Sequence, residues 1–174
     1  QFSEIFGSRA NFNGWVQATS ATAGLTGFFL NGNPALTDVD GAGAVEPAAE
    51  FVLPLAAEDA TAKTEITLLN VNSEPVVATA TLYAQDGRIV ATKDVNLPGR
   101  GLVRQTLQGI FGDADLATAS HLKVRSDRPL IGLEVVADFQ VAGTTRRRET
   151  IALSGMPISA ANSYVLPQFL TGGG

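Results

Sequence analysis

The only histidine of the chain, His121, is the side chain best suited to act as a base for a nucleophile. Nucleophilic catalysis needs a Ser, Thr or Cys beside such a base and a third group that orients it. The chain has no cysteine and no Gly-x-Ser-x-Gly elbow, and His121 lies within a strand-like run. It also aligns with Trp15 in an internal repeat, which favours an aromatic packing role. No catalytic residue is predicted.

Two other groups of residues have the chemistry to bind ions. Asp38-Val39-Asp40-Gly41 begins like a calcium loop but lacks the later ligands of an EF-hand, so an Asx-rich turn and a looser calcium site at Asp38 and Asp40 both stay open. Arg146, Arg147 and Arg148 form the one basic cluster, either a polyanion site or a charged strand edge that discourages unwanted pairing. No cofactor and no metal are predicted.

Composition excludes several classes of function. The 174 residues are 45% hydrophobic and carry a net charge of −5, which argues against nucleic acid or an anionic membrane as the main partner. No apolar run is long enough for membrane insertion. Paired carboxylates could hydrolyse glycosides, but one Trp and two Tyr offer few platforms for sugar rings. We therefore expect a protein that is not an enzyme and has no small-molecule ligand.

The elements that must position any site are short β-rich runs separated by turn residues, a spacing typical of a β-sandwich. Helix is nearly absent, apart from single turns predicted at 2–6 and 107–111 that close the core. Residues 36–50 read as a linker, and Arg128-Pro129 is expected to separate two strands. The predicted strands are 14–20, 24–30, 50–56, 63–71, 75–84, 88–97, 101–107, 119–126, 130–139, 148–154 and 163–170.

Two of these runs alternate clearly between an apolar and a wetter face. In 75–84, the apolar face begins at Val76 and includes Leu82; in 130–139, it begins at Ile131, against a wetter face that contains Glu134. This pattern favours antiparallel sheets with one buried side. Asp86-Gly87 predicts a tight primed turn that joins 75–84 to 88–97 in a hairpin.

Two echoes indicate a degenerate internal repeat. Phe51-Val52-Leu53-Pro54 returns as Tyr164-Val165-Leu166-Pro167, and the Ile-Phe-Gly at residues 5–7 returns at 110–112. Residues 1–50 are therefore predicted to be the later part of one sandwich unit, 51–163 a complete unit, and 164–174 the first strand of the next.

Incomplete units leave unpaired strand edges and bare apolar faces that another segment must cover. Either the chain is part of a longer covalent array, or its last strand adds to the incomplete sheet of another copy in an open head-to-tail polymer. The predicted inserted strand contains Tyr164, Val165, Leu166 and Phe169. The predicted apolar receiver contains Phe2, Ile5, Phe6, Trp15, Phe28 and Phe29.

Several of these motifs together resemble the tandem immunoglobulin-like β-sandwich repeats of exported bacterial surface and fibre proteins. They are the F/Y-V-L-P strand, T-x-x-T-L-L-N at Thr64 to Asn70, the Asp-Gly hairpin, L-P-G-x-G at Leu97 to Gly101, and I-F-G. The resemblance implies an all-β, antiparallel fold and an extracellular or cell-surface scaffold whose partners are other copies of itself. The alternative is a non-catalytic carbohydrate-binding or adhesion module of a secreted protein.

Overall fold

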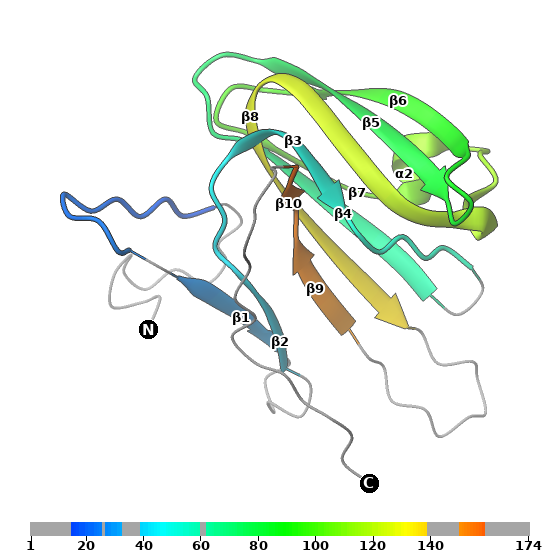
Figure 1. Ribbon diagram of the computed structural model, residues 1–174, viewed down its shortest axis with the longest axis horizontal. Helices are drawn as coiled ribbons and strands as arrows, with labels where there is room; N and C mark the ends of the chain where they lie inside the picture. The colour runs from blue at the N-terminus through cyan, green and yellow to red at the C-terminus, as the bar shows by residue number, and fades with distance from the viewer. Residues whose placement is uncertain (1–14, 26, 33–38, 60–61, 139–149, 159–174) are drawn as a thin grey trace, which may run out of the picture.

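The computed structural model describes residues 15–25, 27–32, 39–59, 62–138 and 150–158. This part of the chain is all-β, almost entirely antiparallel, with one short helix and one 3₁₀ turn (Figure 1). The elements are β1 (Phe28–Gly32), β2 (Val39–Gly43), β3 (Ala48–Leu53), β4 (Ala62–Asn70), β5 (Val76–Ala84), β6 (Ile89–Leu97), β7 (Leu102–Thr106), α2 (Leu107–Phe111), a 3₁₀ turn (Leu116–Thr118), β8 (Ala119–Asp138), β9 (Thr150–Ser154) and β10 (Met156–Pro157).

The longest strand, β8, belongs to two layers. Its first half pairs with β5 and β3, and its second half pairs with β4 and β9. Between the halves the strand curves over the top of the molecule in Figure 1, which carries the sheet from one layer into the other. We call β6, β5, the first half of β8, β3 and β10 the β5 layer. The β4 layer consists of β7, β4, the second half of β8 and β9.

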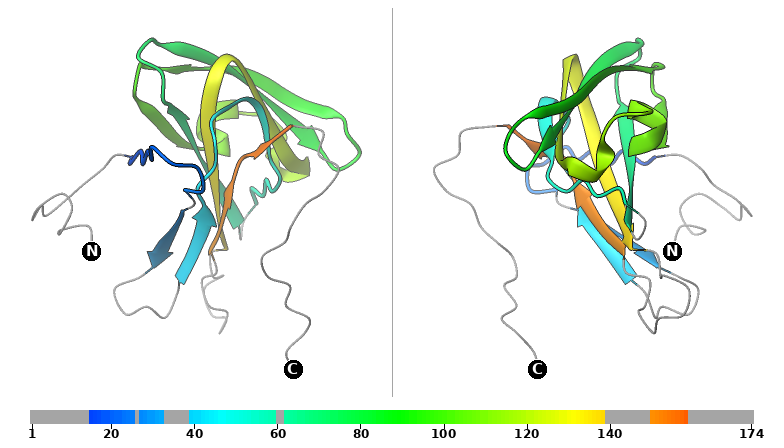
Figure 2. Two further views of the ribbon diagram at one scale, coloured as in Figure 1. Left: turned by 60° about the vertical axis from the view of Figure 1, so that its left-hand side comes forward. Right: turned by 90° about the vertical axis from the view of Figure 1, so that its right-hand side faces the viewer.

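The core lies between these layers and is closed by α2. Leu82 and Leu122 from the β5 layer belong to the same buried cluster as Ile66 and Leu68 from β4. The short helix α2 lies at one end of the layers (Figure 2) and contacts β4, β6 and β7. Its Leu107 and Phe111 are buried. This confirms the predicted turn of helix at 107–111; the turn predicted at 2–6 lies outside the described residues.

The β5–β6 hairpin is confirmed with its predicted alternation. Val76, Ala78, Ala80, Leu82 and Ala84 are all buried, and the residues between them face outward. The turn differs from the prediction, however. Only Gly87 has a positive φ, of 84°, and Ala84 N–H donates to Arg88 O, so this is a three-residue loop with glycine in the left-handed position.

The second half of β8 is reversed relative to its predicted orientation. Leu130, Gly132, Glu134 and Val136 are buried, on the face expected to be wetter, and of the described residues on the opposite face only Ala137 is buried. Ile131, Leu133 and Val135 are only half-buried and lie on the outer face. The structural reason is Phe51 of β3, whose ring occupies the space that a side chain at Gly132 would need.

Phe51 lies across two glycines in the middle of the core. A Cβ added at Gly132 would come within 2.8 Å of Phe51 Cζ, and one added at Gly155 within 2.6 Å of Phe51 Cδ2. Gly155 N–H also donates to Gly132 O at 2.8 Å, so both glycines belong to one contact. Only a residue without a side chain allows the ring this close to the backbone.

Glu134 is fully buried and fixes the loop that follows β3. Its Oε1 accepts a hydrogen bond from Leu55 N–H at 3.0 Å, while its Oε2 is buried with no hydrogen-bond partner among the described residues. Beside it, the hydroxyl of Thr64 both accepts from Ala57 N–H and donates to Ala57 O. Burial raises the pKa of Glu134 to about 7, against a small opposing effect of the Leu55 hydrogen bond.

Three other sequence expectations are wrong. Residues 15–20 form no strand, because this segment pairs with no neighbouring backbone in the described structure. The predicted linker 36–50 contains β2 and the beginning of β3. Arg128-Pro129 does not end a strand: Pro129 lies within β8, between the residues that pair with β5 and those that pair with β4, and Ser126 Oγ donates to Arg128 O at 2.5 Å.

The boundary predicted between residues 50 and 51 falls inside β3, which begins at Ala48. The division into units 1–50, 51–163 and 164–174 stays a prediction. The last predicted unit, residues 164–174, and the strand predicted at 163–170 lie outside the described residues.

Replacing Gly132 with Ala should lower the free energy of unfolding by about 1–3 kcal/mol, because the new methyl group overlaps the Phe51 ring. Urea unfolding followed by circular dichroism measures this. Gly43→Ala is the matched control, since an added Cβ there meets nothing within 4 Å. Combining Phe51→Leu with Gly132→Ala should cost less than the sum of the two single changes; strict additivity would contradict the proposed contact.

Glu134→Gln should change how stability depends on pH. The pKa of Glu134 is about 7 in the folded chain against an ordinary value of 4.5, so between these two pH values the folded state holds the proton and the unfolded state does not. The wild-type free energy of unfolding therefore falls as pH rises from about 4.5 to about 7. Relative to wild type, Glu134→Gln should gain on the order of 2–3 kcal/mol between pH 4.5 and pH 8.

Parallel urea titrations at the two pH values measure this difference. Glu74→Gln, which removes a carboxylate from an exposed turn, controls for the loss of one negative charge. An equal wild-type-to-variant difference at both pH values would contradict a neutral Glu134 in the folded protein.

Candidate functional site

The outer face of the β4 layer carries an unusual number of apolar side chains. Ile131 and Leu133 of β8 lie there because Phe51 and Gly132 turn the other face of the strand inward. Leu69 of β4 pairs with Ile131 on one side and with Leu102 of β7 on the other. The result is a row of aliphatic side chains across three strands.

The segment before β1 and the β1–β2 hairpin form the wall of a groove over this row. Trp15, Val16, Phe28 and Ala44 line the groove together with the aliphatic row, and its volume is about 640 Å³. A second hollow of about 450 Å³ shares Trp15, Leu69 and Ile131 and extends toward Leu25. We call the two together the apolar groove.

Polar contacts hold the hairpin wall beside β9. Ser154 Oγ donates to Gly43 O at 2.7 Å, and Ala152 N–H donates to the carboxylate of Asp40. The carboxylate thus satisfies a backbone donor on the outer edge of β9 that another strand could otherwise use. In Figure 1 the β1–β2 hairpin lies at the lower left, on the side of the molecule away from α2.

Trp15 is held in place by a hydrogen bond to a distant turn. Its indole Nε1–H donates to Arg100 O at 3.1 Å, in the turn between β6 and β7. Arg100 itself has a positive φ of 54°, so this turn presents its carbonyl in an uncommon backbone conformation. The indole is half-buried and keeps part of its ring in the groove.

The chemistry available in the larger hollow is hydrophobic contact. None of the residues that line it is ionisable. Several apolar side chains in and beside the groove are exposed: Phe28 by 75%, Val16 by 58% and Leu25 by 58%. Covering a side chain the size of Phe28 is worth about 1.5–3 kcal/mol. The groove is therefore suited to an apolar chain segment.

The structure brings together two of the predicted receiver residues, Trp15 and Phe28. Phe29 lies in β1, although its side chain is not among those described. The other predicted assembly residues, Phe2, Ile5, Phe6, Tyr164, Val165, Leu166 and Phe169, lie outside the described residues.

Sequence reasoning missed the floor of the groove. The alternation of 130–139 predicts that Ile131 and Leu133 face the interior, and no motif singles out Leu69 or Leu102. The one available signal was Gly132 in the middle of a strand, since such a glycine often marks the close approach of another group.

Of the predicted ion-binding groups, only Asp40 is described. Its Oδ1 accepts from Gly41 N–H at 2.7 Å, but Asp40 lies in strand β2 and this bond reaches only the next residue, whereas an Asx turn bonds two residues on. Within the described ranges, no three His, Cys, Asp or Glu side chains gather as metal ligands. Asp38, the other half of the calcium candidate, and Arg146 to Arg148 lie outside those ranges.

His121 lies on the outer face of the β5 layer. Its ring stacks on Tyr83 with centroids 5.0 Å apart and planes 4° from parallel. Within the same described part of the chain, no helix is long and apolar enough to cross a membrane.

Comparison with known proteins supports the fold alone. No protein-family model and no curated protein matches the sequence. The crystal structure of Thermotoga maritima 1070 is similar, with a TM-score of 0.51 and 10% sequence identity over 67% of this chain and 100% of that one. At this identity the likeness concerns the arrangement of strands.

Proposed function

We propose that this chain is a structural subunit of an extracellular filament or surface stalk, and that its apolar groove receives the segment 164–170 of a second copy. The observation that carries the proposal is the groove itself, in which Trp15 and Phe28 meet an aliphatic floor. A large exposed apolar surface is a common mark of a protein–protein contact.

The choice of occupant rests on the sequence. Tyr164-Val165-Leu166-Pro167-Gln168-Phe169-Leu170 has six apolar or aromatic residues out of seven, counting Pro167, and no charge. It repeats Phe51-Val52-Leu53-Pro54, which covers the end of β3 and buries Phe51 and Leu53 in the core of this unit. A segment of the same kind is therefore suited to an apolar surface of the same fold.

A groove on one part of the chain and an insert on another give a head-to-tail contact, which extends without closing. The same proposal includes an immunoglobulin-like repeat. Residues 51–163 are then one complete unit, and residues 1–50 and 164–174 are parts of neighbouring units. No described residue that lines the groove's larger hollow is ionisable, which favours docking over chemistry there.

Deleting residues 164–174 should abolish assembly. We expect wild-type protein to form concentration-dependent oligomers by size-exclusion chromatography and filaments by electron microscopy, and the deleted chain to remain monomeric. Phe28→Asp should weaken assembly at least tenfold, because it puts a charge into the contact. Ile89→Asp is the matched control: Ile89 is 56% exposed on β6, away from the groove. Filaments unchanged by the deletion would overturn the docking role.

Trp15 offers a direct reporter of the same contact, because it is the one tryptophan of the chain and lines the groove. A synthetic peptide of residues 163–170 added to the deleted chain should shift Trp15 emission to shorter wavelength, as water leaves the indole. The shift should saturate, and Phe28→Asp should weaken it. If instead a monomeric wild-type chain already has the shifted emission, the segment binds within its own chain and the filament proposal fails.

A further inference from the structure

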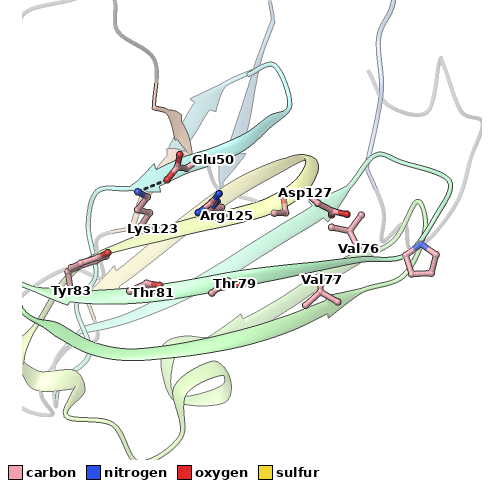
Figure 3. A pocket seen from close by; sticks show the side chains of 11 residues that line it. Glu50, Val76, Val77, Thr79, Thr81, Tyr83, Lys123, Arg125 and Asp127 are labelled. Atoms are coloured by element: carbon pink, nitrogen blue, oxygen red, sulfur yellow. Dashed lines mark ion pairs between the residues drawn. The ribbon is translucent and has the colours of Figure 1, made fainter.

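A second groove lies on the outer face of the β5 layer, and its chemistry is the opposite of the first. It has a volume of about 730 Å³ and follows β5 from Tyr83 to Pro75 (Figure 3). At the usual rise of a strand, eight residue steps give a length of about 26 Å. This length suits an extended ligand better than a single small molecule.

The strand register places polar side chains in rows across the layer. Thr79 is opposite Asp94 of β6 on one side and Arg125 of β8 on the other, and Arg125 is opposite Glu50 of β3. One row therefore presents a carboxylate, a hydroxyl, a guanidinium and a second carboxylate. The next row along β5 presents Thr81 opposite Lys123.

Hydrogen bonds and charges hold these groups in place. Thr79 Oγ1 donates to Asp94 Oδ1 at 2.8 Å, and Thr92 Oγ1 donates to Thr81 Oγ1 at 3.4 Å. Lys123 forms an ion pair with Glu50. The hydrogen bond from Lys123 lowers the pKa of the Glu50 carboxyl, so the carboxylate is charged at neutral pH.

The end of the groove at Tyr83 is aromatic. The Tyr83 ring stacks on His121, which holds it in one orientation beside Thr81. In Figure 3 Tyr83, Thr81 and Thr79 follow one strand, and Lys123 and Arg125 follow the next. An apolar ring face thus lies at the end of a row of hydrogen-bonding groups.

The geometry points to a binding site for a neutral oligosaccharide along this groove. Vicinal sugar hydroxyls both donate and accept hydrogen bonds, and they find here charged donors in Arg125 and Lys123 and charged acceptors in Glu50 and Asp127. An anionic ligand would meet the two carboxylates, and a cationic one would meet the guanidinium and ammonium. A neutral polyol uses both signs, and its ring faces can pack on Tyr83. This ligand class departs from the main expectation from the sequence, which was no small-molecule ligand, and agrees with the alternative of a carbohydrate-binding module.

Isothermal titration of the full chain with maltohexaose, cellohexaose, xylohexaose and chitohexaose tests the site. At least one should bind, and Arg125→Met should raise its Kd at least tenfold, because the variant keeps the apolar stem and loses the charged donor. Arg125 is exposed, so the change leaves the core intact. Lys93→Met, on exposed β6, is the matched control and should leave the Kd unchanged.

Failure of all four sugars would overturn the proposal, and so would equal affinity of wild type and Arg125→Met. Heparin is the probe for the rival ligand class. If the chain binds heparin alone, and this binding is lost in roughly 0.5 M salt, where the Debye length is only a few Å, the groove is an anion site and not a site for a neutral sugar. Phe28→Asp should not alter sugar binding, so this result is independent of assembly through the apolar groove.

Discussion

The strand β8 pairs with strands of both layers, and the rest of the described fold depends on this pairing. The first half of β8 pairs with β5 and β3, and the second half with β4 and β9. Its twenty residues reach both layers by a curve between the two halves (Figure 1), and Pro129 lies between the last residue paired with β5 and the first paired with β4. A proline lacks a backbone donor, so it is tolerated where the strand passes from one set of partners to the next. Weakening this bend would loosen the two layers together.

The contact between Phe51 and Gly132 decides which face of the second half of β8 points inward. Phe51 needs space against the backbone, and Gly132 with Gly155 provides it. Once Gly132 faces the core, the period of two brings Leu130, Glu134 and Val136 inward and sends Ile131 and Leu133 outward. The buried carboxyl of Glu134 and the apolar outer surface of the β4 layer both follow from the contact between Phe51 and Gly132. The carboxyl is partly compensated by Leu55 N–H, and the outer surface is partly covered by Trp15 and the β1–β2 hairpin.

Sequence patterns predict most strands of this fold and miss what depends on contacts distant in sequence. Local alternation identifies β5 and its buried face, and Asp86-Gly87 identifies the hairpin. The same alternation assigns the wrong face of β8 to the core, since hydrophobicity alone cannot reveal a ring from β3 lying on a glycine. Of the candidate site, Trp15 and Phe28 follow from their aromatic character. The aliphatic floor does not, because those residues look like ordinary core.

The outer faces of the β5 layer and the β4 layer differ in polarity because the two layers place different residues in the core. In the β5 layer, small inward residues such as Ala78 and Ala80 fill a tight core, and threonines and charged residues occupy the outer positions. In the β4 layer, the inward positions include Gly132 and Glu134, so part of the apolar content of β8 is displaced to the outside. A partner that covers apolar surface and a ligand that exchanges hydrogen bonds would therefore select opposite faces. Because the core separates these faces, both could be occupied in one subunit, and a filament built through the β4 layer would leave the polar groove of every copy open to solvent.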